Sequence, residues 1–177
     1  FLLLNKSDAK ELTKSNNVIY IYHNEIDSTG DDAISEEKVF DAVERTFKQL
    51  TKIVKQIANL SGTNIFITAD HGFIYTNKLT EDSEFCKLDI TFMDTSKVNR
   101  RFVIGKNLEE NSCTEKFTSD ELGINGDNDF LITKSINKIR KQGGGNRFVH
   151  GGATLQELVI PLLEIKYHRK NVITDVE

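Results

Sequence analysis

The sequence has few cysteines, one proline and no long apolar run. Its two cysteines, Cys86 and Cys113, show no metal-binding spacing and have no further partners. We therefore expect reduced, unpaired thiols in a cytoplasmic protein and not a disulfide framework. No apolar stretch approaches the roughly 18 residues needed to cross a bilayer, which argues against a membrane partner. The chain also shows no internal repeat.

The charges nearly balance. The chain has 27 Asp and Glu residues and 23 Lys and Arg residues, so its net charge is −4. A charge this mild argues against a general electrostatic grip on nucleic acid, although a local basic patch could still bind phosphates. With 177 residues, 38% of them hydrophobic, the chain can build one core. Because it begins with Phe1 and not with Met, we interpret residues 1–177 as a single partial domain of a longer protein.

Apolar patterning predicts a strand, a helix and a second strand. Residues 18–22 (VIYIY) form a continuous β-favouring run, which is typical of a strand buried on both faces. Over residues 36–60 the apolar side chains recur at steps of three and four, which predicts a helix with Ser35 as N-cap. Residues 64–68 predict the next strand. A strand–helix–strand unit implies parallel pairing, so we expect an α/β fold with a mostly parallel sheet.

The remaining sequence gives weaker signals. Between 78 and 128, short β-like runs (LDITFM and RRFVIG) lie among polar residues, which indicates an insertion or a meander. Residues 129–135 predict another strand. Thr154 and Glu157 have the spacing of a capping box, which predicts a short helix before a final strand.

Acids and a histidine follow the two predicted strands, at the edge where open α/β sheets bind ligands. Asp27 and Asp31 come after the first strand, and Asp70 and His71 end the second. Carboxylates crowded at one edge repel each other unless a cation neutralises them. Carboxylate and imidazole ligands together suit zinc or manganese, and carboxylates alone suit magnesium or calcium. The alternative is that Asp70 only caps a turn and His71 is exposed.

His150 is the third element of this pattern, and two glycines after it let the backbone approach a site closely. Five basic residues nearby could contact the phosphates of a nucleic acid or nucleotide. They are Lys134, Lys138, Arg140, Lys141 and Arg147. A solvated loop is the alternative interpretation. The run QGGGN is not a P-loop, because the Lys-Ser/Thr ending is missing.

Three stretches together resemble the PglZ domain of bacterial BREX and phage-growth-limitation defence systems, which belongs to the alkaline phosphatase superfamily. They are VIYIYHNEIDSTGDD, NIFITADHGFIYTN and RFVHGGATLQELVIPLL. The resemblance covers nearly the whole chain and is thin between 78 and 128. It implies the C-terminal half of an alkaline-phosphatase-like three-layer domain with a mostly parallel sheet, and other phage-defence proteins as partners.

The resemblance also implies two divalent metal sites in the intact domain, for Zn, Mn or Mg. Asp27, Asp31 and His150 match one site, where Asp31 replaces the histidine of most members and so favours manganese or magnesium. Asp70 and His71 match the other, together with an acid and a nucleophilic Ser or Thr expected upstream of this chain.

We therefore expect a metal-dependent phosphohydrolase (a phosphatase, phosphodiesterase or nuclease) acting in bacteriophage defence. The isolated chain, without its nucleophile, should be inactive. The alternative is a non-catalytic interaction or scaffold module that keeps the superfamily fold.

Overall fold

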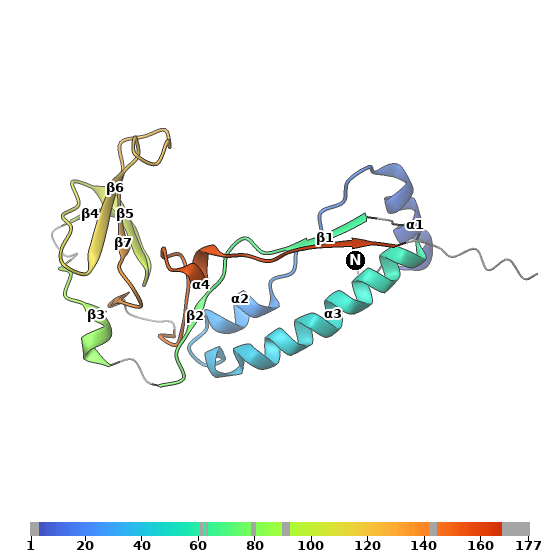
Figure 1. Ribbon diagram of the computed structural model, residues 1–177, viewed down its shortest axis with the longest axis horizontal. Helices are drawn as coiled ribbons and strands as arrows, with labels where there is room; N and C mark the ends of the chain where they lie inside the picture. The colour runs from blue at the N-terminus through green and yellow to red at the C-terminus, as the bar shows by residue number, and fades with distance from the viewer. Residues whose placement is uncertain are drawn as a thin grey trace, which may run out of the picture.

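The structure, a computed structural model, describes residues 4–60, 62, 64–78, 81–89, 93–141 and 145–167. The molecule is elongated (Figure 1): a four-stranded sheet occupies one end, and helix α3 and the paired strands β1 and β10 extend to the other. No helix in these ranges has both the length and the apolar character that a membrane span requires.

Short helices and strands make up most of the fold. The helical elements are α1 (Lys6–Ser15), α2 (Glu25–Gly30), η1 (Glu36–Lys38), α3 (Val39–Asn59), η2 (Asp82–Glu84) and α4 (Leu155–Leu158). The strands are β1 (Asn64–Thr68), β2 (Ile74–Tyr75), β3 (Phe85–Cys86), β4 (Asp94–Val98), β5 (Phe102–Lys106), β6 (Thr114–Thr118), β7 (Asp129–Thr133), β8 (Lys138–Ile139), β9 (Phe148–Val149) and β10 (Leu162–Lys166).

The helix predicted over residues 36–60 is confirmed, because η1 and α3 together cover it. Val39 on its apolar face is fully buried, whereas Phe47 stays 63% exposed, so the face is only partly covered. Ser35 occupies the predicted N-cap position before Glu36, but its side chain does not cap the helix. The hydroxyl of Ser35 donates to the carbonyl oxygen of Thr29 at 2.8 Å and makes no capping bond.

The predicted first strand and the parallel crossover are wrong. Residues 18–22 form no strand in the structure, and the Tyr20 and Tyr22 side chains are 79% and 91% exposed. Strand β1 pairs instead with β10, and the pairing is antiparallel. The apolar run of 18–22 has strand propensity, but a strand also needs a partner with which to form hydrogen bonds. Among the described strands the parallel pair is β3 with β8, so the fold is mixed α/β with small, mostly antiparallel sheets and not the expected three-layer arrangement.

The largest sheet has the order β4–β5–β7–β6 and is antiparallel throughout. The predicted strand at 129–135 is confirmed as β7, and RRFVIG contains most of β5. Residues 90–92 of LDITFM lie outside the described residues. The stretch 78–128 thus supplies β4, β5 and β6, and β7 completes the sheet. Val103 of β5 and Leu131 of β7 form a buried apolar cluster with Leu108 and Ile139.

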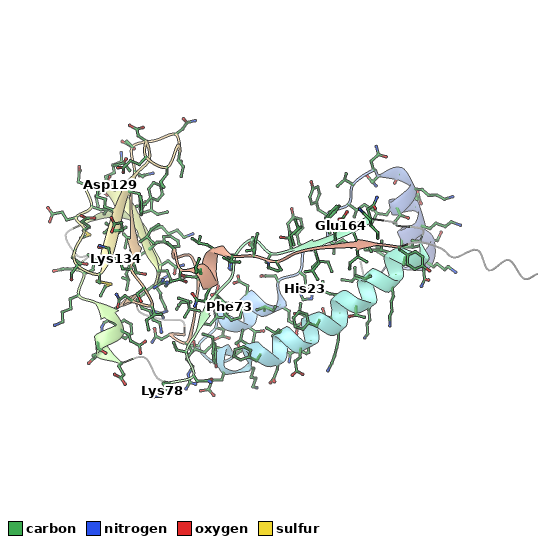
Figure 2. All side chains as sticks on the ribbon, in the orientation of Figure 1. His23, Phe73, Lys78, Asp129, Lys134 and Glu164 are labelled. Carbon is green, nitrogen blue, oxygen red and sulfur yellow. A yellow bond between two sulfur atoms is a disulfide. The ribbon has the colours of Figure 1, made fainter. Side chains whose placement is uncertain are left out.

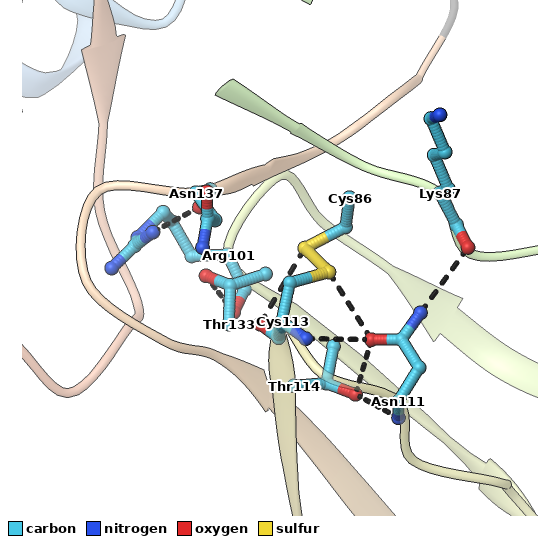
Figure 3. Close-up of a disulfide and its surroundings, with 8 residues drawn as sticks. All are labelled: Cys86, Lys87, Arg101, Asn111, Cys113, Thr114, Thr133 and Asn137. Atoms are coloured by element: carbon cyan, nitrogen blue, oxygen red, sulfur yellow. Dashed lines mark hydrogen bonds between the residues drawn. A yellow bond between two sulfur atoms is a disulfide. The ribbon is translucent and has the colours of Figure 1, made fainter. Parts of the chain in front are cut away.

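The expectation of unpaired cysteines is also wrong. A disulfide joins Cys86 on β3 to Cys113, with the Cα atoms 5.8 Å apart (Figure 3). The Asn111 side-chain oxygen accepts a hydrogen bond from the Cys113 backbone N–H at 3.0 Å and helps to fix this turn. A separation of 27 residues says nothing about which strands meet, so only the fold shows this pairing.

Candidate metal centre

Three elements bring Asp27, His71 and His150 together. Asp27 lies on α2, His71 follows β1, and His150 follows β9 directly. Antiparallel pairing of β2 with β9 carries the two histidine loops to the same place. One candidate ligand atom from each of the three residues lies within 4.8 Å of the other two.

Helix α2 is fixed on α3, and this positions Asp27. The Glu25 carboxylate accepts hydrogen bonds from Arg45 at 2.5 Å and from Gln49 at 2.7 Å, both on α3. At the other end of α2, the ring of Phe148 packs directly over Gly30 and leaves no room for a Cβ atom. Because Phe148 is two residues before His150, the same contact links α2 to the histidine loop.

The distances within the cluster are short. Asp27 Oδ1 lies 3.6 Å from His150 Nε2 and 3.8 Å from His71 Nε2. The two imidazole rings stack almost parallel, with centroids 4.2 Å apart. On the outer sides, Asp31 Oδ1 lies 3.3 Å from His150 Nε2, and Asp70 Oδ2 lies 3.9 Å from His71 Nε2.

The His71 ring is oriented with Nε2 toward the cluster. Its Nδ1 lies 3.1 Å from the carbonyl oxygen of Gly72. Because a carbonyl only accepts hydrogen bonds, Nδ1 carries the proton of the neutral ring and Nε2 keeps its lone pair. Hydrogen bonding of one ring nitrogen to a backbone carbonyl is the usual arrangement of a metal-ligating histidine.

The chemistry of the donor atoms fits a cation. Asp27 Oδ1 is buried and has no hydrogen-bond partner among the described residues. A buried acceptor left unpaired costs about 1–3 kcal/mol, and a bound ion would remove that cost. Ligands at about 2.0–2.2 Å from a zinc ion lie roughly 3–3.5 Å from one another. The separations from Asp27 Oδ1 to the two imidazole nitrogens, 3.6 and 3.8 Å, are close to that spacing.

The five predicted ligands differ in how far their side chains are exposed to solvent. The side chains of Asp27, His71 and His150 are 34%, 30% and 20% exposed, whereas those of Asp31 and Asp70 are 57% and 91% exposed. All five predicted ligands therefore lie in one region, with the two acids toward solvent.

Four of the five predicted basic residues are engaged in ion pairs with acidic side chains. The pairs are Lys134–Glu115 at 2.9 Å, Lys138–Glu84 at 3.4 Å, Arg140–Asp82 at 2.6 Å and Arg147–Glu37 at 2.9 Å. Lys138 is fully buried, so a ligand in solvent cannot reach its ammonium group, and the burial also lowers its pKa. Lys134 directly follows β7, at the end of the molecule that carries the four-stranded sheet (Figure 2).

Lys141 is the predicted basic residue that lies beside the centre. It lines a cavity of about 180 Å³ together with Asp31 and His150. Arg100 lines the same cavity and was not predicted from the sequence. The sequence did carry a signal, because two arginines, Arg100 and Arg101, precede β5. Sequence alone, however, does not distinguish a buried arginine from an exposed one.

The family model and the known proteins that match this chain all indicate the same family. The model of the BREX system PglZ alkaline phosphatase-like domain matches residues 1–165. Alkaline phosphatase-like protein BrxZ of Escherichia coli O9:H4 (strain HS) is 38% identical over 171 residues, which are 96% of this chain and 20% of that protein. Alkaline phosphatase-like protein PglZ of Bacillus cereus (strain H3081.97) is 38% identical over 180 residues, with 98% and 21% covered. No solved structure matches. The chain spans about a fifth of the length of these relatives.

Proposed function

Because this chain belongs to the PglZ family of BREX systems, whose domain is alkaline phosphatase-like, we propose that it carries metal ligands of a phosphohydrolase acting in phage defence. The proposed inner ligands are Asp27, His71 and His150. The observation that carries the proposal is the buried Asp27 Oδ1, which has no hydrogen-bond partner among the described residues and faces two imidazole nitrogens. Other proteins of the BREX system are the proposed partners.

We further propose that the intact domain holds two divalent ions. Asp27, Asp31 and His150 would bind one, and Asp70 and His71 would bind the other with residues from elsewhere in the full-length protein. The mixed carboxylate and imidazole donors favour zinc or manganese, and the outer acids also suit magnesium. The nucleophile would also come from outside residues 1–177.

A bound metal would polarise a phosphoryl oxygen and stabilise the charge that develops during phosphoryl transfer. The residues of this chain hold the donors in place: the Gly72 carbonyl fixes the proton of His71 on Nδ1, and α2 holds the Asp27 carboxylate beside the Nε2 atoms of both rings. The cavity beside His150 would receive the substrate, and the positive charges of Lys141 and Arg100 on its wall would attract the phosphate. This supports a phosphate monoester or diester, including nucleic acid, as substrate.

The test uses the full-length protein and a matched pair of histidine variants. His150→Ala should lose bound metal, measured by inductively coupled plasma mass spectrometry, and should lose hydrolysis of nitrophenyl phosphate mono- and diesters and of DNA. His23→Ala is the control, because His23 bonds Gln49 on α3 and lies outside the cluster.

An active protein whose metal content and turnover are unchanged in His150→Ala would overturn the metal site. A protein that binds metal through His150 but hydrolyses none of these substrates would favour the scaffold module instead.

A further inference from the structure

One glutamate bonds to both histidine loops. The backbone carbonyl oxygen of Glu157, on α4, accepts a hydrogen bond from the N–H of Gly72 at 2.8 Å. Its carboxylate oxygen Oε1 accepts one from the N–H of Gly152 at 2.9 Å. Gly72 directly follows His71, and Gly152 is two residues after His150, so the separation of the two rings depends on this residue.

The carboxylate of Glu157 is itself held by Arg101. The two side chains are 1% and 0% exposed and form a bidentate pair, with Nε to Oε1 at 2.8 Å and Nη2 to Oε2 at 2.9 Å. Arg101 also donates to the backbone carbonyl oxygens of Asn137 and Ser135. The guanidinium thus joins the four-stranded sheet to the turn that carries α4.

The remaining bonds to this carboxylate form the capping box predicted from the sequence. Glu157 Oε2 accepts from the Thr154 hydroxyl at 2.7 Å and from its backbone N–H at 3.2 Å. Burial acts to raise the pKa of Glu157, but the bonds from Arg101 and Thr154 outweigh it, and the pKa is lowered. The group is therefore charged at neutral pH and accepts every one of these hydrogen bonds.

The packing leaves these loops little freedom to move independently. A Cβ atom at Gly72 would overlap the carbonyl oxygen of Gln156, and one at Gly152 would come within 2.6 Å of the Arg101 guanidinium. Gly151, between the second histidine and this contact, has a φ of +92°, which favours glycine. Both histidine loops therefore lie in direct contact with the α4 turn or with the arginine that holds it.

We infer that Glu157 is a positioning residue for the metal centre and that Arg101 locks it in place. Glu157 touches neither ligand, but it sets the spacing of His71 and His150 through the backbone on either side. The inference rests on the proposed function, because it assigns the pair a role only if the two histidines bind metal. Through Arg101, the four-stranded sheet would then help to position the metal ligands, although none of the proposed ligands lies on that sheet.

The experiment measures metal affinity in the full-length protein by competition with a chromophoric chelator. Arg101→Met combined with Glu157→Leu replaces the ion pair with apolar groups of similar volume, a change that folds tolerate. It removes the acceptor for Gly152, so zinc affinity should fall by about 10- to 100-fold, the usual effect of losing a residue that orients ligands. Glu157→Gln keeps one acceptor oxygen and should show a smaller loss.

A core variant separates positioning from stability. Val103→Ala opens a cavity in the neighbouring strand β5, where Val103 is fully buried, and should lower the melting temperature without changing zinc affinity. Wild-type affinity in the folded double variant and in Glu157→Gln would overturn the positioning role, as would an equal loss of affinity in Val103→Ala. A wild-type protein that binds no metal would overturn the proposed function as well, so the two failures are distinguishable.

Discussion

Wild-type protein and the Asp27→Ala variant should rank differently in stability without metal and with saturating metal. Without metal, the buried Oδ1 is an unpaired acceptor, which costs about 1–3 kcal/mol. Asp27→Ala removes that cost and loses an acid in the first turn of α2, which contributes about 0.3–1 kcal/mol. We therefore expect the metal-free variant to be more stable than wild type by about 0–2.7 kcal/mol.

Saturating metal should reverse this order. At a free metal concentration 100 times Kd, binding stabilises the wild-type protein by about 2.7 kcal/mol. For a cooperative unit of this chain's size, each kcal/mol shifts Tm by about 2–4 °C, so wild type should gain roughly 5–11 °C and Asp27→Ala almost nothing.

The assay is thermal unfolding of full-length wild type and variant, once with a chelator and once with zinc or manganese. Asp41→Ala, an exposed acid on α3, is the control and should behave as wild type. The reasoning is refuted if Asp27→Ala melts well below wild type in chelator, or if it keeps the full gain on adding metal.

Three further changes have defined outcomes. The native pKa of Glu157 lies below its unfolded value, so the stability that this carboxylate contributes is complete above the unfolded pKa, ordinarily about 4.3. That contribution is lost as the pH falls through the native pKa. In Glu157→Gln, the free energy of unfolding measured with urea should therefore fall less steeply at acid pH than in wild type. Breaking the Cys86–Cys113 disulfide by double replacement with serine should cost up to about 3–4 kcal/mol for a loop of this length, read as a lower Tm against untreated protein. Gly30→Val should collide with the Phe148 ring, cost about 1–3 kcal/mol and weaken zinc binding, whereas stable protein with unchanged affinity would show that α2 can shift freely.

Sequence patterns predicted the elements that depend on local periodicity or spacing. The helix over 36–60 follows from its apolar steps, and the capping box at Thr154 from a three-residue spacing. Asp27, His71 and His150 do lie together, but the expected cause, neighbouring parallel strands, is wrong. The β2–β9 pairing brings the histidines close, and each of these strands has only two residues, too few to leave a periodic signal.

Charged residues were the least predictable from sequence. Lys138 was expected on a phosphate-binding surface and is fully buried beside Glu84, and Arg101 gave no sign that it would enter the core. Hydropathy assigns both to the surface, because burial of a charge depends on a partner that is 54 or 56 residues distant in the chain. Such pairings are decided by tertiary contacts and not by any window of sequence.

The ion pair between Arg101 and Glu157 also bears on how the protein can be shortened. The four-stranded sheet stands apart at one end of the molecule and looks like a candidate for excision in engineering a minimal version (Figure 1). Removing the sheet together with Arg101 would leave the buried Glu157 carboxylate without its counterion, next to the loops that carry His71 and His150. Any trimmed version would therefore need an apolar residue in place of Glu157 before the proposed metal binding could be tested in it.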